Sequence, residues 1–77
     1  MTEITQVFQE WWRMVKDQHE RLEAADYDET VWCEVVRESA AFGTKHEELG
    51  FAFRMAALGN EMLVYLKGCD TRESERN

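Results

Sequence analysis

The segment from Thr44 to Lys67 constrains the fold most, because it is apolar almost all the way round when its residues are placed on a helical wheel. Glu47, Arg54 and Glu61, spaced by seven, leave only a narrow polar stripe. A helix this apolar has to be covered on most sides, by its own chain or by another one. Arg54, Asn60 and Glu61 interrupt the ~20 apolar residues that a bilayer requires. The segment is therefore predicted to be a central core helix and not a membrane span.

Two amphipathic helices are predicted before this segment, at residues 3–25 and at about residues 27–42. Thr2 is placed to cap the first helix, whose apolar face covers about 160° of the wheel and suits contact with two neighbours. The prediction is an all-α chain of three helices, in which the first helix packs on a hairpin of the other two. The first apolar face consists of Ile4, Val7, Phe8, Trp11, Val15, Leu22 and Ala25.

The segments between the helices carry recognisable signals. Asp26 or Asp28 is predicted to cap the second helix, and Asp26 with Glu29 has the spacing of a capping box. Gly43 is predicted to end that helix in the left-handed conformation, and residues 44–47 to start the third helix as another capping box. So short a turn predicts that the second and third helices are antiparallel neighbours.

The third helix contains two weak points. Gly50 costs roughly 1 kcal/mol relative to Ala inside a helix, which predicts a close helix approach there. At Gly59-Asn60 the helix either continues to Lys67, or breaks so that residues 62–66 fold back. Residues 1–68 are predicted to form one domain, and the polar residues 69–77 are predicted to fray.

Charge and composition exclude several classes of protein. The net charge is −7, and residues 1–44 hold ten acids against four bases. Direct binding to nucleic acid is disfavoured, because phosphate neutralisation needs clustered Lys and Arg. No charged-then-apolar leader opens the chain, and the two cysteines lack zinc or redox spacing, so a cytoplasmic protein with reduced thiols is expected. No nucleophile triad or Gly-rich phosphate loop is present, and no cofactor is expected.

The lengths of the helices predict self-association. The end of the third helix should project beyond the end of the first, and the start of the first should extend past the turn at Gly43. Large apolar side chains left in water forfeit about 1.5 to 3 kcal/mol each, which a second copy of the chain could recover. The prediction is a homodimer that completes a larger helical bundle. Its interface is predicted to include Ile4, Val7, Phe8, Met62, Leu63, Tyr65 and Leu66.

The acidic half of the chain predicts a protein partner with a basic surface. The interpretation we favour is a small, non-enzymatic protein interaction module, which could inhibit or regulate a nucleic-acid-binding protein of the kind that phages and mobile elements encode. Trp12, at the edge of the first apolar face, is a candidate apolar anchor. The candidate acidic residues are Glu20, Glu23, Asp26, Asp28, Glu29, Glu34 and Glu38.

Two metal-based alternatives use the same acids. Glu34 and Glu38, one helical turn apart, could join Glu20 and Glu23 to bind Mg²⁺ and a nucleotide, as the paired carboxylates of helical pyrophosphohydrolases do. The sequence lacks the fuller acidic motif of such enzymes. His19 with Glu23 could also supply metal ligands, but the Glu-x-x-His pair of di-iron bundles is absent.

Overall fold

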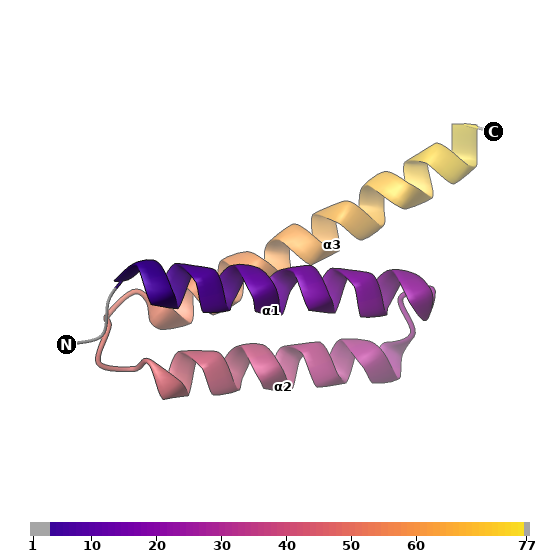
Figure 1. Cartoon of the computed structure of the whole chain (residues 1–77). Helices are drawn as coiled ribbons and strands as arrows, with labels where there is room; N and C mark the ends of the chain where they lie inside the picture. The colour runs from indigo at the N-terminus through magenta and orange to yellow at the C-terminus, as the bar shows by residue number, and fades with distance from the viewer. Residues whose placement is uncertain (1–3, 77) are drawn as a thin grey trace.

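The computed structural model is all-helical within the part of the chain it describes, which is the backbone of residues 4–76 and the side chains of residues 4–68. The three helices are α1 (Ile4–Ala24), α2 (Glu29–Lys45) and α3 (Ala52–Arg76). α1 and α2 lie side by side, and α3 runs back along them before its second half diverges from the pair (Figure 1). The predicted all-α fold of three helices is therefore confirmed. Thr2 lies outside the described residues, so its predicted capping role stays a prediction. The backbone of residues 69–76 is part of α3, and their predicted fraying is not tested and stays a prediction.

The turn between α1 and α2 combines a left-handed helix end with a capped helix start. The Tyr27 N–H donates to the Leu22 carbonyl at 2.8 Å and the Asp26 N–H to the Glu23 carbonyl at 3.1 Å, which is the Schellman pattern. Asp26 occupies the left-handed position of this motif, with φ of 52°. The Asp28 carboxylate then accepts the Thr30 N–H at 3.0 Å and caps α2. Of the two aspartates that could cap α2, the structure selects Asp28.

The end of α2 differs from the sequence prediction. The helix continues through Gly43 to Lys45, and no glycine of the described residues has a positive φ. A Cβ added to Gly43 would lie 2.5 Å from Phe53 Cδ1, so this glycine makes room for a ring from α3. The predicted left-handed helix end at Gly43 is therefore wrong. Gly43 lies inside α2, where the absence of a side chain allows the Phe53 ring to pack closely.

The capping box predicted at residues 44–47 is also wrong, because α3 starts only at Ala52. Residues 46–51 form a connection of tight turns, in which the Leu49 N–H donates to the His46 carbonyl at 2.9 Å and the Ala52 N–H to the Leu49 carbonyl at 3.0 Å. α2 and α3 are nevertheless antiparallel neighbours, as predicted (Figure 1).

The close helix approach occurs at Gly59 and not at Gly50. Gly50 lies in the connection before α3, and an added Cβ would meet nothing within 4 Å. At Gly59 an added Cβ would lie 3.0 Å from Val15 Cγ2 and 3.4 Å from Trp11 Nε1. The Trp11 indole donates to the Met55 carbonyl at 2.7 Å, one turn before Gly59. α3 is continuous through this point, so the alternative of a break at Gly59-Asn60 is excluded.

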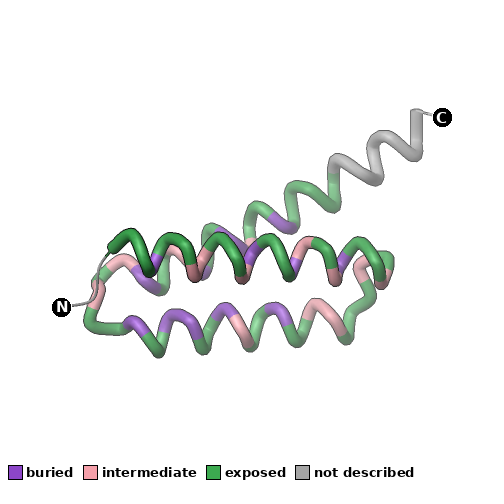
Figure 2. The backbone as a smooth tube through the Cα atoms, in the orientation of Figure 1, coloured by how far each residue is buried: buried purple, intermediate pink, exposed green. Residues whose placement is uncertain are grey.

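The core is divided into two clusters along the axis of the bundle. One contains Val15, Leu22, Val35 and Leu63, and the other contains Val7, Phe42 and Ala56. Trp11 and Met14 pack against both clusters and join them. Figure 2 shows that buried positions line the inner sides of the three helices, while residues 64–68, the last of α3 whose side chains are described, are exposed. Within the described residues, none of the helices is both long and apolar enough to cross a membrane, as expected.

The two aspartates of the α1–α2 turn should respond to substitution in opposite directions. Asp26→Gly should raise the free energy of unfolding by about 0.5 to 1 kcal/mol, because glycine adopts a positive φ without steric cost. Asp28→Ala should lower it by about 1 kcal/mol, because the N-cap of α2 is lost. Both variants remove one negative charge, so each controls for the other in urea titrations. Equal shifts for the two variants would contradict this account of the turn.

The close approach at Gly59 should make that position intolerant of a side chain. Gly59→Leu should lower the free energy of unfolding by about 1 to 3 kcal/mol, because Val15 and Trp11 would have to move. Gly68→Leu is the matched control, since nothing lies within 4 Å of a Cβ there. It should raise stability by up to about 0.8 kcal/mol through helix propensity. Thermal unfolding followed by circular dichroism would compare them, and equal stability of the two variants would argue against a tight α1–α3 contact.

Candidate interaction surfaces

The turn between α1 and α2 gathers most of the acidic residues predicted to bind a partner. Figure 1 places this turn at the end of the bundle opposite the α2–α3 connection. Six of the seven candidates are exposed, and Glu38 is half-buried. Glu20, Asp26 and Glu29 have no side-chain partner among residues 4–68, so their charges face solvent. The other exposed candidates are Glu23, which lies 3.5 Å from His19, Asp28, which caps α2, and Glu34.

Arg21 is surrounded by carboxylates and joins α1 to α2. Its Nη1 donates to Glu38 Oε2 at 2.9 Å and its Nη2 donates to Glu38 Oε1. Arg21 Nε lies 2.9 Å from Asp17 and Nη1 lies 3.8 Å from Glu34. The hydrogen bonds from Arg21 hold the pKa of Glu38 below its usual value, although partial burial opposes this. Glu38 therefore makes an internal contact, unlike the unpartnered Glu20, Asp26 and Glu29.

Gln18 lies beside this ion pair and is completely buried. Its Nε2 donates to Glu38 Oε1 at 3.2 Å and, at a longer 3.4 Å, to the Val35 carbonyl. The nitrogen of this buried amide is therefore hydrogen-bonded. The oxygen Oε1 is buried and accepts no hydrogen bond from the described residues. Gln18 and Arg21, both on α1, thus donate to the same Glu38 carboxylate of α2.

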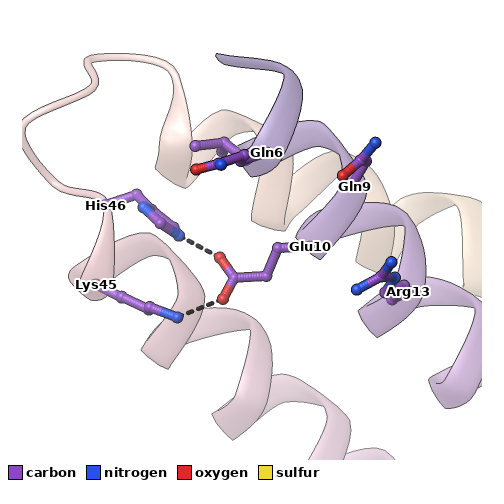
Figure 3. A pocket seen from close by; sticks show the side chains of 7 residues that line it. Gln6, Gln9, Glu10, Arg13, Lys45 and His46 are labelled. Carbon is purple, nitrogen blue, oxygen red and sulfur yellow. Dashed lines mark hydrogen bonds and ion pairs between the residues drawn. The ribbon is translucent and has the colours of Figure 1, made fainter. Parts of the chain in front are cut away.

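A second polar cluster lies at the opposite end of α1. A pocket of about 410 Å³ is lined by Gln6, Val7, Gln9, Glu10 and Arg13 of α1 and by Lys45 and His46. Figure 3 shows Lys45 and His46 both directed at the Glu10 carboxylate, while no contact is drawn to Gln9 or Arg13 of α1. The hydrogen bond from Lys45 is the main reason that the pKa of Glu10 is lowered. The Glu10 carboxylate is paired with both Lys45 and His46, so this contact clamps the end of α2 onto α1.

The two metal-based alternatives receive no support from the geometry of the described residues. No group of three or more His, Cys, Asp or Glu side chains among the described residues is close enough to hold a metal ion. Glu38, which the pyrophosphohydrolase alternative requires, is instead hydrogen-bonded to Arg21 and Gln18. His19 pairs with Glu23 one turn along α1. Cys33 is a free thiol on the surface of α2.

The residues predicted to form a dimer interface divide into two groups. Val7 and Leu63 are buried in the core of their own chain, with exposures of 1% and 0%, so in this fold they are not available to a partner. The other five side chains are exposed: Ile4, Phe8, Met62, Tyr65 and Leu66. Trp12, predicted as an apolar anchor, is 55% exposed.

The exposed apolar residues form two rows on neighbouring helices. On α1, Ile4, Phe8 and Trp12 follow one another at intervals of four residues. On α3, Leu58, Met62, Tyr65 and Leu66 line a shallow hollow of about 280 Å³ together with Glu61. Leu58 was not among the predicted interface residues. The spacing of Met55, Leu58, Met62 and Tyr65, which alternates between three and four, is a coiled-coil signal that was present in the sequence.

Acid should weaken the contact between Arg21 and Glu38. A carboxylate whose pKa is lowered by folding stabilises the fold above its unfolded pKa, and that stability is lost as the pH falls through the folded pKa. Glu38→Gln should therefore cost about 1 kcal/mol near pH 7, and the difference from the natural chain should shrink as the pH falls through the lowered pKa of Glu38. Urea titrations at several pH values would measure it. Glu34→Gln, 3.8 Å from Arg21 and more exposed, is the control and should have little effect; a pH-independent loss for Glu38→Gln would contradict the assignment.

Comparisons with known proteins add no family assignment. No family model matches the chain, and no match was found among curated proteins or solved structures. No catalytic or binding residue can therefore be transferred from a relative. The function is inferred from the charges and apolar side chains that the fold places on its surface.

Proposed function

We propose that this protein is a small, non-enzymatic interaction module, and that the acidic turn between α1 and α2 binds a basic surface on another protein. The observation that carries the proposal is the concentration of charge at one end of the bundle. Residues 17–38 hold eight acids and two bases, Arg21 and Arg37. Arg21 is already paired with Glu38 and Asp17, so it neutralises little of the exposed charge.

The arrangement of the free acids supports recognition by charge. Glu20 near the end of α1, Asp26 in the turn and Glu29 at the start of α2 come from three successive elements and are all exposed. The Schellman turn and the Asp28 cap hold the backbone between them in a defined conformation. A fixed group of carboxylates attracts a basic partner and speeds its association, and the interaction weakens as salt rises.

The partner class that fits this surface is a protein that itself binds nucleic acid. Such proteins present clustered Lys and Arg side chains to phosphates. Carboxylates carried on this defined turn can pair with the same basic side chains and so compete with the nucleic acid. In this proposal the module inhibits or regulates its partner by covering the basic surface, without any chemical step.

A competition experiment tests the acidic surface directly. The probe is an Arg-rich, DNA-binding peptide bound to a labelled DNA duplex, and the readout is release of the peptide as the protein is added. Glu20→Gln with Glu29→Gln should weaken competition by roughly three- to tenfold at low salt, because two unpaired carboxylates are lost.

The matched control is Glu47→Gln with Glu48→Gln, in the connection at the opposite end of the bundle. This variant changes the net charge by the same amount, and it should compete within about twofold of the natural chain. Equal weakening by both variants would mean that only the total charge matters, and would overturn the assignment to the α1–α2 turn.

A further inference from the structure

α3 carries an apolar seam whose first residue, Met55, is half-buried against the cluster of Val7, Phe42 and Ala56, and whose other three residues the chain leaves exposed. Met55, Leu58, Met62 and Tyr65 alternate in spacing between three and four residues, which places them in a single row along the helix. Leu58 and Tyr65 are 50% and 68% exposed, and Met62 is 37% exposed. Met62 and Tyr65 lie in the second half of α3, which diverges from α1 and α2 (Figure 1). A row with this period fits the side of another helix.

The two edges of the seam differ in chemistry. Gly59 and Leu66 lie along the edge that faces α1, since Trp11 and Val15 of α1 contact Gly59. Arg54 and Glu61 lie along the opposite edge, each directly before a seam residue. Both are exposed, and neither takes part in an ion pair among residues 4–68. They have opposite charges and are seven residues apart, so they cannot pair within the helix.

We propose that a second copy of this chain covers the seam, with the two α3 helices antiparallel and centred near Asn60. In this register Met55 packs against Tyr65 of the second copy, and Leu58 packs against its Met62. In an antiparallel pair, the edge with Arg54 and Glu61 faces the same edge of the other chain. Arg54 of each chain then lies beside Glu61 of the other, so the interface contains two Arg54–Glu61 pairs of opposite charge.

The same register covers the exposed row on α1. The α1 row lies near the start of the seam. The Phe8 ring lies 6.4 Å from the ring of Phe51, four residues before Met55, and Trp11, next to Trp12, donates to the Met55 backbone carbonyl. On the edge facing α1, Leu66 of the second copy lies opposite Gly59. The projecting end of one α3 is thereby placed over Phe8 and Trp12 of the other chain. The exposed apolar side chains on the two helices bury each other.

Self-complementarity is the reason to choose a second copy over a different protein. An unrelated helix would need its own matching seam and charges, whereas this chain supplies all of them in one register. A parallel pair is disfavoured, because it would place Arg54 opposite the uncharged Gly59 edge of the other helix. This inference is independent of the proposed acidic surface, which lies on the α1–α2 turn.

Exchange of the two charges tests both the occupant and the register. The full chain is examined by sedimentation equilibrium over a hundredfold range of concentration, and circular dichroism verifies the helical fold of each variant. Arg54→Glu alone and Glu61→Arg alone should each weaken the dimer by about tenfold or more at low salt, because two attractions become repulsions. The double variant Arg54→Glu with Glu61→Arg should restore dimerisation to near the natural level. Leu58→Asp should give a folded monomer.

Three outcomes would overturn the proposal. A monomer mass for the natural chain at every concentration would exclude the second copy as the occupant. A dimer that is unaffected by Leu58→Asp would place the interface elsewhere. A dimer that is weakened by both single charge variants but not restored by the double variant would exclude the antiparallel register. None of these results bears on competition by the acidic turn, so the two proposals are distinguishable.

Discussion

The contact between α1 and α3 at Gly59 determines which surfaces this small protein presents. Because Gly59 has no side chain, Val15 and Trp11 approach α3 closely, and the Trp11 indole reaches the Met55 carbonyl. Trp11 also packs against both halves of the core, so it fixes the level of α1 along α3. Beyond Leu63 the helices separate, and the apolar side chains that follow are exposed. A chain of this length buries only about 60% of its unfolded surface, and the exposed remainder is where its interactions must occur.

Charge is distributed between internal clamps and a free surface. Glu38 with Arg21 and Glu10 with Lys45 and His46 tie α2 to α1 near its two ends, and their hydrogen bonds lower the pKa of both carboxyls. These acids stabilise the fold and leave little charge for a partner. Glu20, Asp26 and Glu29 make no such internal contact among residues 4–68, and the turn between α1 and α2 exposes them together. The acidic end and the apolar seam of α3 are therefore separate surfaces with different chemistry.

The fold could be predicted from the sequence where a residue pattern alone determines the structure. The apolar period gave three helices, and the short connections gave antiparallel neighbours. Prediction failed where one residue type serves two physical purposes. Gly43 and Gly50 are compatible both with a helix end and with a close contact, and the identity of the neighbour decides between them. Only the fold shows that Phe53 lies over Gly43 and that nothing approaches Gly50.

The sequence by itself determined the all-α class, the excess of acid in the first half and the capping role of an aspartate before α2, because these follow from local periodicity and composition. It also contained the alternating spacing of Met55, Leu58, Met62 and Tyr65. Tertiary structure decided which apolar residues are exposed: Val7 and Leu63 enter the core, while Phe8 and Tyr65, close to them in the chain, do not. The physical reason is that burial depends on the crossing of α1 and α3, which long-range contacts set and no local pattern encodes.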